Sequence, residues 1–294
     1  MDLGFGFKEL ADDQESILEK NLVLVLGFPR SGTTWLGTQL LSHNTNIVNE
    51  FRIADHLAVR SKEMGDEVVR RVDQKQNDEN YLFASKFKKN WIIFLRKLIL
   101  NRIYAQFRDL DHKIIIKEPN PIDVSDIISD CFEKSKIILL VRDGRDVIDS
   151  VIDAKQEDGF MAKAGQKPLQ IQRRLKFIEN QARLWKYTTE NLLKTFDKKN
   201  NENIRLIKYE RLLDNTFEEL QKIYEFINVE ISQNELQNII EKYSFKKIPD
   251  KLKGEGKFYR AATPGLWKEH FSDDEKKLMN ELMKDTLKKL EYEH

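Results

Sequence analysis

The sequence predicts an α/β protein with a central parallel sheet flanked by helices, and three observations support this fold class. Short apolar, β-branched runs alternate with segments of helical periodicity, as in a parallel sheet covered on both faces. The first run is followed by a glycine-containing loop and a helical segment, the arrangement of a phosphate-binding loop. At 294 residues, 40% apolar and 34% charged, the chain can bury a large core.

The order of strands and helices follows from these patterns. Five apolar runs are predicted to be strands, the second being the weakest: Leu22–Leu26, Asn46–Val48, Lys113–Lys117, Lys136–Val141 and Ile204–Ile207. The predicted helices are 33–42, 54–73, 84–108, 122–132, 144–155, 170–196, 216–227, 233–242 and 273–290. The stretches 156–169 and 244–265 are predicted to be loops, because they are rich in Gly, Lys and turn residues. No repeat or Pro/Gly/Ser-rich linker interrupts the chain, so we predict one domain, 1–294, with an N-terminal extension, 1–20.

Composition limits the classes of function. A net charge of +1 provides no global field for nucleic acid or an anionic membrane. The single cysteine, Cys131, excludes an internal disulfide and indicates a reducing compartment. The N-terminus lacks the basic start and apolar run of a signal peptide, so we predict a cytoplasmic protein. The apolar stretch 90–107 contains Arg96, Lys97 and Arg102. It is therefore predicted to be an amphipathic helix packed on the body, not a membrane span.

The loop after the first strand contains the most informative motif. The stretch "LVLVLGFPRSGTTWLGTQLL" has Gly27 and Gly32 at the spacing of the Walker pattern G-x-x-x-x-G-K-[ST]. Thr33 stands where that pattern has its lysine, and the cation lies within the loop as Arg30. Backbone N–H groups and a helix N-terminus in this arrangement predict a site for a phosphate-bearing ligand.

Cations follow two further strands of the predicted sheet. The third apolar run ends at Lys117 and is followed by Glu118, and the fourth is followed by Arg142. Ligands of open α/β sheets bind at the carboxyl ends of the strands, and a Mg²⁺-dependent hydrolase usually has a carboxylate there. We therefore predict a site for several anionic groups with no metal. Ser150 lies eight residues after Arg142. The two side chains can bind the same phosphate if the predicted helix 144–155 folds back over that phosphate.

These motifs together resemble a known family. The loop "GFPRSGTTWL" and the pair Arg142/Ser150 in "VRDGRDVIDS" resemble the sulfotransferases that use 3′-phosphoadenosine 5′-phosphosulfate (PAPS). Arginine at position 30 is similar to the tyrosylprotein and many bacterial members, whereas cytosolic members usually have lysine. The resemblance spans about residues 22–275 and includes "IKYERLLDN" (207–215). It implies the P-loop NTPase-like fold of that family and a single sulfotransferase-like domain.

A late motif extends the resemblance with one departure. The stretch "YRAATPGLWKEHF" (259–271) is similar to the family's R-K-G-x-x-G-x-W-K-x-x-F motif. It matches at Arg260, Gly265, Trp267, Lys268 and Phe271. Ala261 and Ala262 stand where the family has Lys and Gly, so part of the family's 3′-phosphate cradle is not matched.

The resemblance implies an enzyme of the EC 2.8.2 class, with PAPS as sulfuryl donor and adenosine 3′,5′-bisphosphate (PAP) as product. The first loop would bind the 5′-phosphosulfate, and Arg142 with Ser150 the 3′-phosphate. Trp35 and Tyr209 would lie near the adenine, although Trp35 on an apolar helix face is equally consistent with a core residue. The implied donor-binding residues are Arg30, Ser31, Gly32, Thr33, Thr34, Trp35, Arg142, Ser150, Tyr209 and Arg260.

The predicted reaction is an in-line displacement, by analogy with phosphoryl transfer. Arg30 and Lys117 are the candidates for stabilising the leaving phosphate oxygen. Cytosolic members have a histidine base two residues after the strand-end lysine, where this sequence has Pro119. Because tyrosylprotein and heparan-type members use a glutamate, Glu50 is the first candidate base and Glu118 the second.

Two alternatives to the transferase remain at this stage. One is a P-loop kinase or nucleotide hydrolase, against which the missing lysine and strand-end carboxylates count. The other is a non-catalytic PAP-binding protein, which the Ala261-Ala262 departure permits. The acceptor is predicted to be a hydroxyl or amine of a small molecule, saccharide or peptide. The sequence predicts no nucleic-acid partner, and it does not indicate the oligomeric state.

Overall fold

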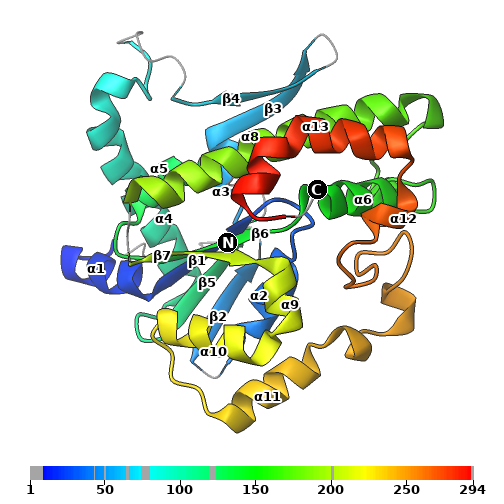
Figure 1. Ribbon diagram of the computed structural model, residues 1–294. Helices are drawn as coiled ribbons and strands as arrows, with labels where there is room; N and C mark the ends of the chain where they lie inside the picture. The colour runs from blue at the N-terminus through cyan, green and yellow to red at the C-terminus, as the bar shows by residue number, and fades with distance from the viewer. Residues whose placement is uncertain are drawn as a thin grey trace, which may run out of the picture.

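A five-stranded parallel sheet forms the centre of the protein (Figure 1). The computed structural model describes residues 9–42, 44–49, 51–63, 66–73, 80–118, 124–199 and 202–292. The strands are β1 (Leu22–Gly27), β2 (Thr45–Asn49), β5 (Lys113–Glu118), β6 (Lys136–Val141) and β7 (Ile204–Lys208), in the order β2-β5-β1-β6-β7. This confirms the predicted fold class and all five predicted strands, including the weak second one.

The three middle strands are buried on both faces, as their continuous apolar runs require. In β1, Leu24 and Leu26 belong to one apolar cluster, whereas Val23 and Val25 belong to the other. Successive side chains of a strand point to opposite faces, so β1 contributes apolar side chains to the core on both faces of the sheet. This buried sheet supports the loops that follow the carboxyl ends of its strands.

Helices cover both faces of the sheet, and the two apolar clusters identify which helix lies on which face. One layer consists of α1 (Asp12–Asn21), α4 (Lys88–Phe107), α5 (Ser125–Cys131), α6 (Gly144–Ala154), α8 (Arg174–Lys199) and α13 (Asp273–Lys289). The opposite layer consists of α2 (Thr33–Gln39), α9 (Tyr209–Asp214), α10 (Thr216–Phe226) and α11 (Gln233–Lys242). Figure 1 shows α8 and α13 side by side on one side of the sheet and α10 on the other.

Short elements connect these layers. They are α3 (Ile53–Leu57), η1 (Ser85–Phe87), α7 (Phe160–Lys163), η3 (Ile171–Arg173), η4 (Phe245–Lys247), η5 (Asp250–Leu252) and α12 (Trp267–His270). Several of them lie in segments that the sequence predicts to be loops, because single turns leave no periodic signal. Within the predicted helix 122–132 the structure describes α5, and residues 119–123 lie outside the described part of the chain.

The predicted helix 54–73 is wrong. After α3 the chain forms an antiparallel hairpin of β3 (Ala58–Glu63) and β4 (Asp66–Arg71), with Ala58 opposite Arg71. The segment mixes charged residues with β-branched valines, a composition compatible with either state. Pairing between two strands decided the outcome, because strand formation depends on the partner more than on local propensity.

The segment predicted as an N-terminal extension contributes to the core. Leu18 of α1 is fully buried. The Arg96 guanidinium of α4 lies 2.6 Å from the Glu15 carboxylate and 2.7 Å from that of Glu19. Two buried carboxylates sharing one guanidinium join α1 to α4 through charge-assisted hydrogen bonds.

Helix α4 packs on the body through buried residues such as Trp91, Leu100 and Ile103. The prediction that it is amphipathic is wrong, because its outer side also carries large apolar residues, with Phe94 71% and Leu98 67% exposed. Among the described helices, none is long and apolar enough to cross a membrane.

Candidate active site

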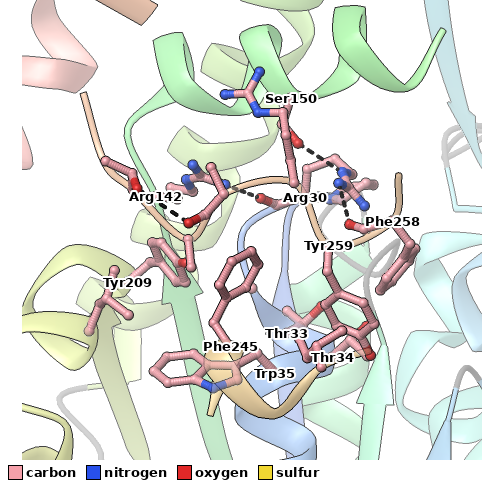
Figure 2. A pocket seen from close by; sticks show the side chains of 18 of the residues that line it. Arg30, Thr33, Thr34, Trp35, Arg142, Ser150, Tyr209, Phe245, Phe258 and Tyr259 are labelled. Atoms are coloured by element: carbon pink, nitrogen blue, oxygen red, sulfur yellow. Dashed lines mark hydrogen bonds between the residues drawn. The ribbon is translucent and has the colours of Figure 1, made fainter. Parts of the chain in front are cut away.

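A pocket of about 570 Å³ lies at the carboxyl ends of β1, β5 and β6 (Figure 2). Ten predicted site residues line it: Arg30, Gly32, Thr33, Thr34, Trp35, Lys117, Arg142, Ser150, Tyr209 and Arg260. Ser31 of the loop is fully buried and does not line the pocket. Glu50, the predicted base, lies outside the described residues. The fold therefore brings together strand ends that are separated by more than a hundred residues in sequence, as expected for this edge of a parallel sheet.

Two glycines shape the loop after β1. A Cβ at Gly27 would lie 2.7 Å from both the Leu140 carbonyl oxygen and Thr33 Cγ2, so this position has no room for a side chain. Gly32 has a φ of 91°, and a Cβ there would lie 2.5 Å from the Tyr209 ring. Glycine alone tolerates both the left-handed backbone and this close approach. The loop thus holds the start of α2 directly against the pocket.

Arg30 reaches across the pocket. Its Nε donates to Ser150 Oγ at 3.0 Å, and its Nη2 donates to the Phe258 carbonyl oxygen at 2.8 Å (Figure 2). Arg30 and Ser150 are therefore in direct contact, although the family resemblance implies that they bind different ends of the donor. Arg30 itself has a φ of 72°, a left-handed conformation that is uncommon for residues other than glycine.

Arg142 occupies the inner side of the same pocket. Its Nη1 donates to the Arg30 carbonyl oxygen at 3.0 Å, and its guanidinium lies 4.8 Å from the centre of the Tyr209 ring. Its buried Nε has no hydrogen-bond partner among the described residues. An unsatisfied buried donor costs free energy, so this atom indicates a position for an acceptor oxygen of a ligand.

The electrostatics of the pocket favour an anion. Burial, together with the nearby charges of Arg142 and Arg260, lowers the pKa of Arg30 to about 10. Repulsion from these neighbouring guanidinium groups disfavours the charged form of Arg30, and a bound phosphate or sulfate relieves it. Among the described residues that line the pocket, none carries a carboxylate.

Part of the pocket wall is aromatic and apolar. The Trp35 and Tyr209 rings are in edge-to-face contact with centroids 5.9 Å apart. Phe245 faces the same space, and Ile248 and Leu213 complete the lining (Figure 2). Trp35 is half-buried and lines the pocket. Aromatic rings in the same pocket as a cluster of guanidinium groups suit a ligand with a flat base and phosphate groups.

Three carboxylates of α6 hold the late motif and the loop just before it. Asp146 accepts from the Gly265 N–H at 2.7 Å, and Asp153 accepts from the Gly256 N–H at 3.0 Å. Between them, Asp149 forms an ion pair with Arg260 and lies 3.0 Å from His270 Nδ1. Sequence reasoning missed these aspartates. Their spacing along one helix face in "VRDGRDVIDSVIDA" was the available signal.

Ala262 stands where the family motif has glycine, and its backbone has the left-handed conformation that favours glycine. Ala262 has a φ of 51°, whereas the neighbouring Ala261 is not left-handed. A left-handed backbone costs a non-glycine residue about 1–2 kcal/mol, and glycine's extra unfolded-state freedom costs about 0.4–1 kcal/mol. Ala262→Gly is therefore expected to raise Tm by about 1–3 °C, and Ala261→Gly to lower it. Calorimetric melting of the two variants checks this, and equal shifts in both would contradict a strained backbone at Ala262.

Lys117 and Glu118 take separate positions at the end of β5. Lys117 is 2% exposed and lines the pocket. Glu118 is 1% exposed, accepts from the Ile53 N–H at 3.1 Å with its Oε2 and does not line the pocket. Successive residues of a strand point to opposite sides, which separates two side chains that the sequence delivers together. Pro119 lies outside the described residues.

Within the part of the chain that the structure describes, no cluster of His, Cys, Asp and Glu has the arrangement of a metal site. The site therefore offers a phosphate-binding loop, three guanidinium groups and an aromatic wall at the carboxyl edge of a parallel sheet. These features define a P-loop-type protein that binds an anionic nucleotide.

Comparison with known families is more specific. The model of the sulfotransferase domain matches residues 20–291, and the chain belongs to this family. The match confirms the predicted family and the predicted class of protein, a sulfotransferase. It does not support the kinase or hydrolase alternative.

Solved structures share the fold at low sequence identity. Mouse sulfotransferase SULT7A1 complexed with PAP is 14% identical, with a TM-score of 0.57 over 94% of this chain and 89% of that one. Retinol dehydratase in complex with androsterone and PAP is 17% identical, with a TM-score of 0.53 over 92% and 81%. Sulfotransferase STF9 from Mycobacterium avium is 12% identical, with a TM-score of 0.53 over 94% and 79%. No curated protein sequence matches the chain.

Proposed function

We propose that the protein binds PAPS in this pocket and transfers its sulfuryl group to a hydroxyl or amine acceptor, releasing PAP. The observation that carries the proposal is the convergence of Arg30, Arg142 and Arg260 beside the glycine loop, with the Arg142 Nε left without a partner among the described residues. A donor with a 5′-phosphosulfate and a 3′-phosphate supplies two anionic groups to this cluster. The rings of Trp35 and Tyr209 border the space for its adenine.

The proposed residue roles follow from position. Arg30 and Lys117 stabilise the phosphate oxygen that gains negative charge as its bond to sulfur breaks, and electrostatic stabilisation of this type is worth about 3–4 kcal/mol per donor. Ser150 and Arg142 bind the 3′-phosphate, with Arg260 held beside them by Asp149. The acceptor oxygen or nitrogen attacks sulfur and gives its proton to Glu50, the base that the sequence predicts.

The acceptor class and the setting of the enzyme are part of the same proposal. The retinol dehydratase structure contains androsterone, which supports a small hydroxylated molecule among the predicted small-molecule, saccharide and peptide acceptors. The one cysteine, Cys131, is buried and free, in keeping with the predicted cytoplasmic location. A single domain over residues 1–294 also remains a prediction, supported by the packing of α1 on α4.

The proposed donor predicts a ligand-specific stabilisation. PAP at a hundred times its Kd should add about 2.7 kcal/mol to the free energy of unfolding, which is a Tm shift of several degrees for a chain of this size. ADP and ATP–Mg²⁺ should produce smaller shifts, since neither carries a 3′-phosphate. Arg142→Ala should lose most of the PAP shift. Differential scanning fluorimetry measures all of these.

Two outcomes would count against the proposal. A larger shift with ATP–Mg²⁺ than with PAP would contradict a 3′-phosphate site at Arg142 and Ser150. A PAP shift without multiple-turnover sulfation of any acceptor from a panel of phenols, alcohols and amines would leave the non-catalytic binding protein as the better description.

A further inference from the structure

The Arg30 guanidinium lies between two phenylalanine rings. Its central carbon is 5.0 Å from the centre of the Phe160 ring and 5.1 Å from that of Phe258. The two rings also contact each other edge-to-face, with centroids 5.4 Å apart. Phe160 begins α7, whereas Phe258 lies in the late loop, so elements almost a hundred residues apart meet on one cation.

The two ring-bearing segments are joined next to Arg30. The Phe160 N–H donates to the Gly256 carbonyl oxygen at 2.8 Å. Asp153 of α6 holds the Gly256 N–H in turn. The Phe258 backbone carbonyl accepts from Arg30 Nη2, and the Tyr259 ring packs against Phe258 at 4.9 Å. Phe160 is therefore held by a backbone contact that does not involve the cation, whereas Phe258 is held both by Arg30 and by the Tyr259 ring.

Ring contacts of this kind suit arginine better than lysine. A guanidinium is planar and weakly hydrated and stacks on aromatic faces, whereas an ammonium is compact and strongly hydrated. Rings attract the cation through their π faces without occupying its N–H donors. Arg30 can thus be desolvated and oriented while the donors that do not bind Ser150 and Phe258 stay available to an anion.

We propose that Phe160 and Phe258 form an aromatic clamp that orients the Arg30 guanidinium for sulfuryl transfer and makes arginine, not lysine, the cation this loop requires. The inference rests on the proposed function, because Arg30 acts in that reaction. The two phenylalanines are positioning residues: they act through Arg30 and not on the donor itself.

A double-mutant cycle tests the clamp. Phe160→Leu should lower kcat about tenfold, in keeping with a desolvated cation–π contact, and should leave the KM for PAPS nearly unchanged. Combined with Arg30→Lys, the same substitution should change kcat by less than about twofold, since lysine gains little from the rings. Phe258→Leu, which keeps the backbone carbonyl, should repeat this pattern. Phe94→Leu on the exposed side of α4 is the control and should leave kcat unchanged.

Equal effects of Phe160→Leu in the wild-type protein and in the Arg30→Lys variant would overturn the clamp, because a purely structural role does not depend on the cation at position 30. A second readout needs no activity. In ¹⁵N-labelled protein, the Arg30 Nε–H resonance should be shifted by the ring currents and should move in both Phe→Leu variants. An Arg30 resonance that neither variant moves also overturns the clamp. A wild-type protein that shows the shifted resonance but sulfates nothing refutes the proposed function instead.

Discussion

Replacing Arg30 by alanine should lower kcat about 10²–10³-fold, because removing one well-placed donor to a developing anion costs about 2.7–4 kcal/mol. The side chain joins Ser150 to the late loop, with Nε 3.0 Å from Ser150 Oγ and Nη2 2.8 Å from the Phe258 carbonyl oxygen. Its substitution also removes one of the charges that attract the donor. A radiolabelled-sulfate transfer assay at saturating PAPS isolates the effect on kcat from the effect on binding.

Arg183→Ala is the matched control for this change. Arg183 is an exposed arginine of α8 that pairs with Glu179, its neighbour one helical turn away. Exposed ion pairs contribute little to stability, so this variant should keep wild-type kcat and Tm. If Arg30→Ala also retained wild-type kcat, leaving-group stabilisation would belong to another cation, with Lys117 the next to test.

Exchanging Glu50 for glutamine should lower kcat about 10²–10⁴-fold, the usual contribution of a general base. PAP binding should stay the same, because glutamine keeps the size of the side chain and no role in donor binding is assigned to this residue. Glu118→Gln should change kcat little. Glu118 is buried away from the pocket lining, where its Oε2 accepts from the Ile53 N–H, and a glutamine carbonyl can accept the same bond.

The pair of variants separates the two candidate bases. Both kcat and the Tm shift with PAP are measured for each variant, so a folding defect is not mistaken for a catalytic one. Loss of kcat in Glu118→Gln with wild-type activity in Glu50→Gln would reverse the assignment. If both variants kept full activity, neither glutamate would be the base.

Much of the candidate site could be predicted from the sequence, because it is built from strand ends. The apolar runs of β1, β5 and β6 predicted a parallel sheet, and the residues after each run had to meet at its carboxyl edge. Lys117 and Arg142 therefore line one pocket, as expected. The loop motif added Arg30 and Gly32, and the late motif added Arg260.

Features that depend on strand pairing or on contacts between distant segments could not be predicted in the same way. The hairpin of β3 and β4 has a composition compatible with either helix or strand, and only its antiparallel pairing identifies the strands. The contact of Phe160 with Arg30 and the bond from Asp153 to Gly256 each join segments about a hundred residues apart or more. Such contacts have no periodicity or local motif, so a single sequence carries no signal for them.

By itself, the sequence determined the class of fold, the family and which cations line the pocket, since these follow from local patterns of apolar residues and short ordered motifs. The tertiary structure decided which of these groups touch. It placed Lys117 in the pocket and buried Glu118 outside the pocket lining. It also set Arg30 against Ser150 and between two rings. The physical reason is that strand alternation and the packing of distant loops orient side chains, and both depend on the assembled sheet and not on neighbours in sequence.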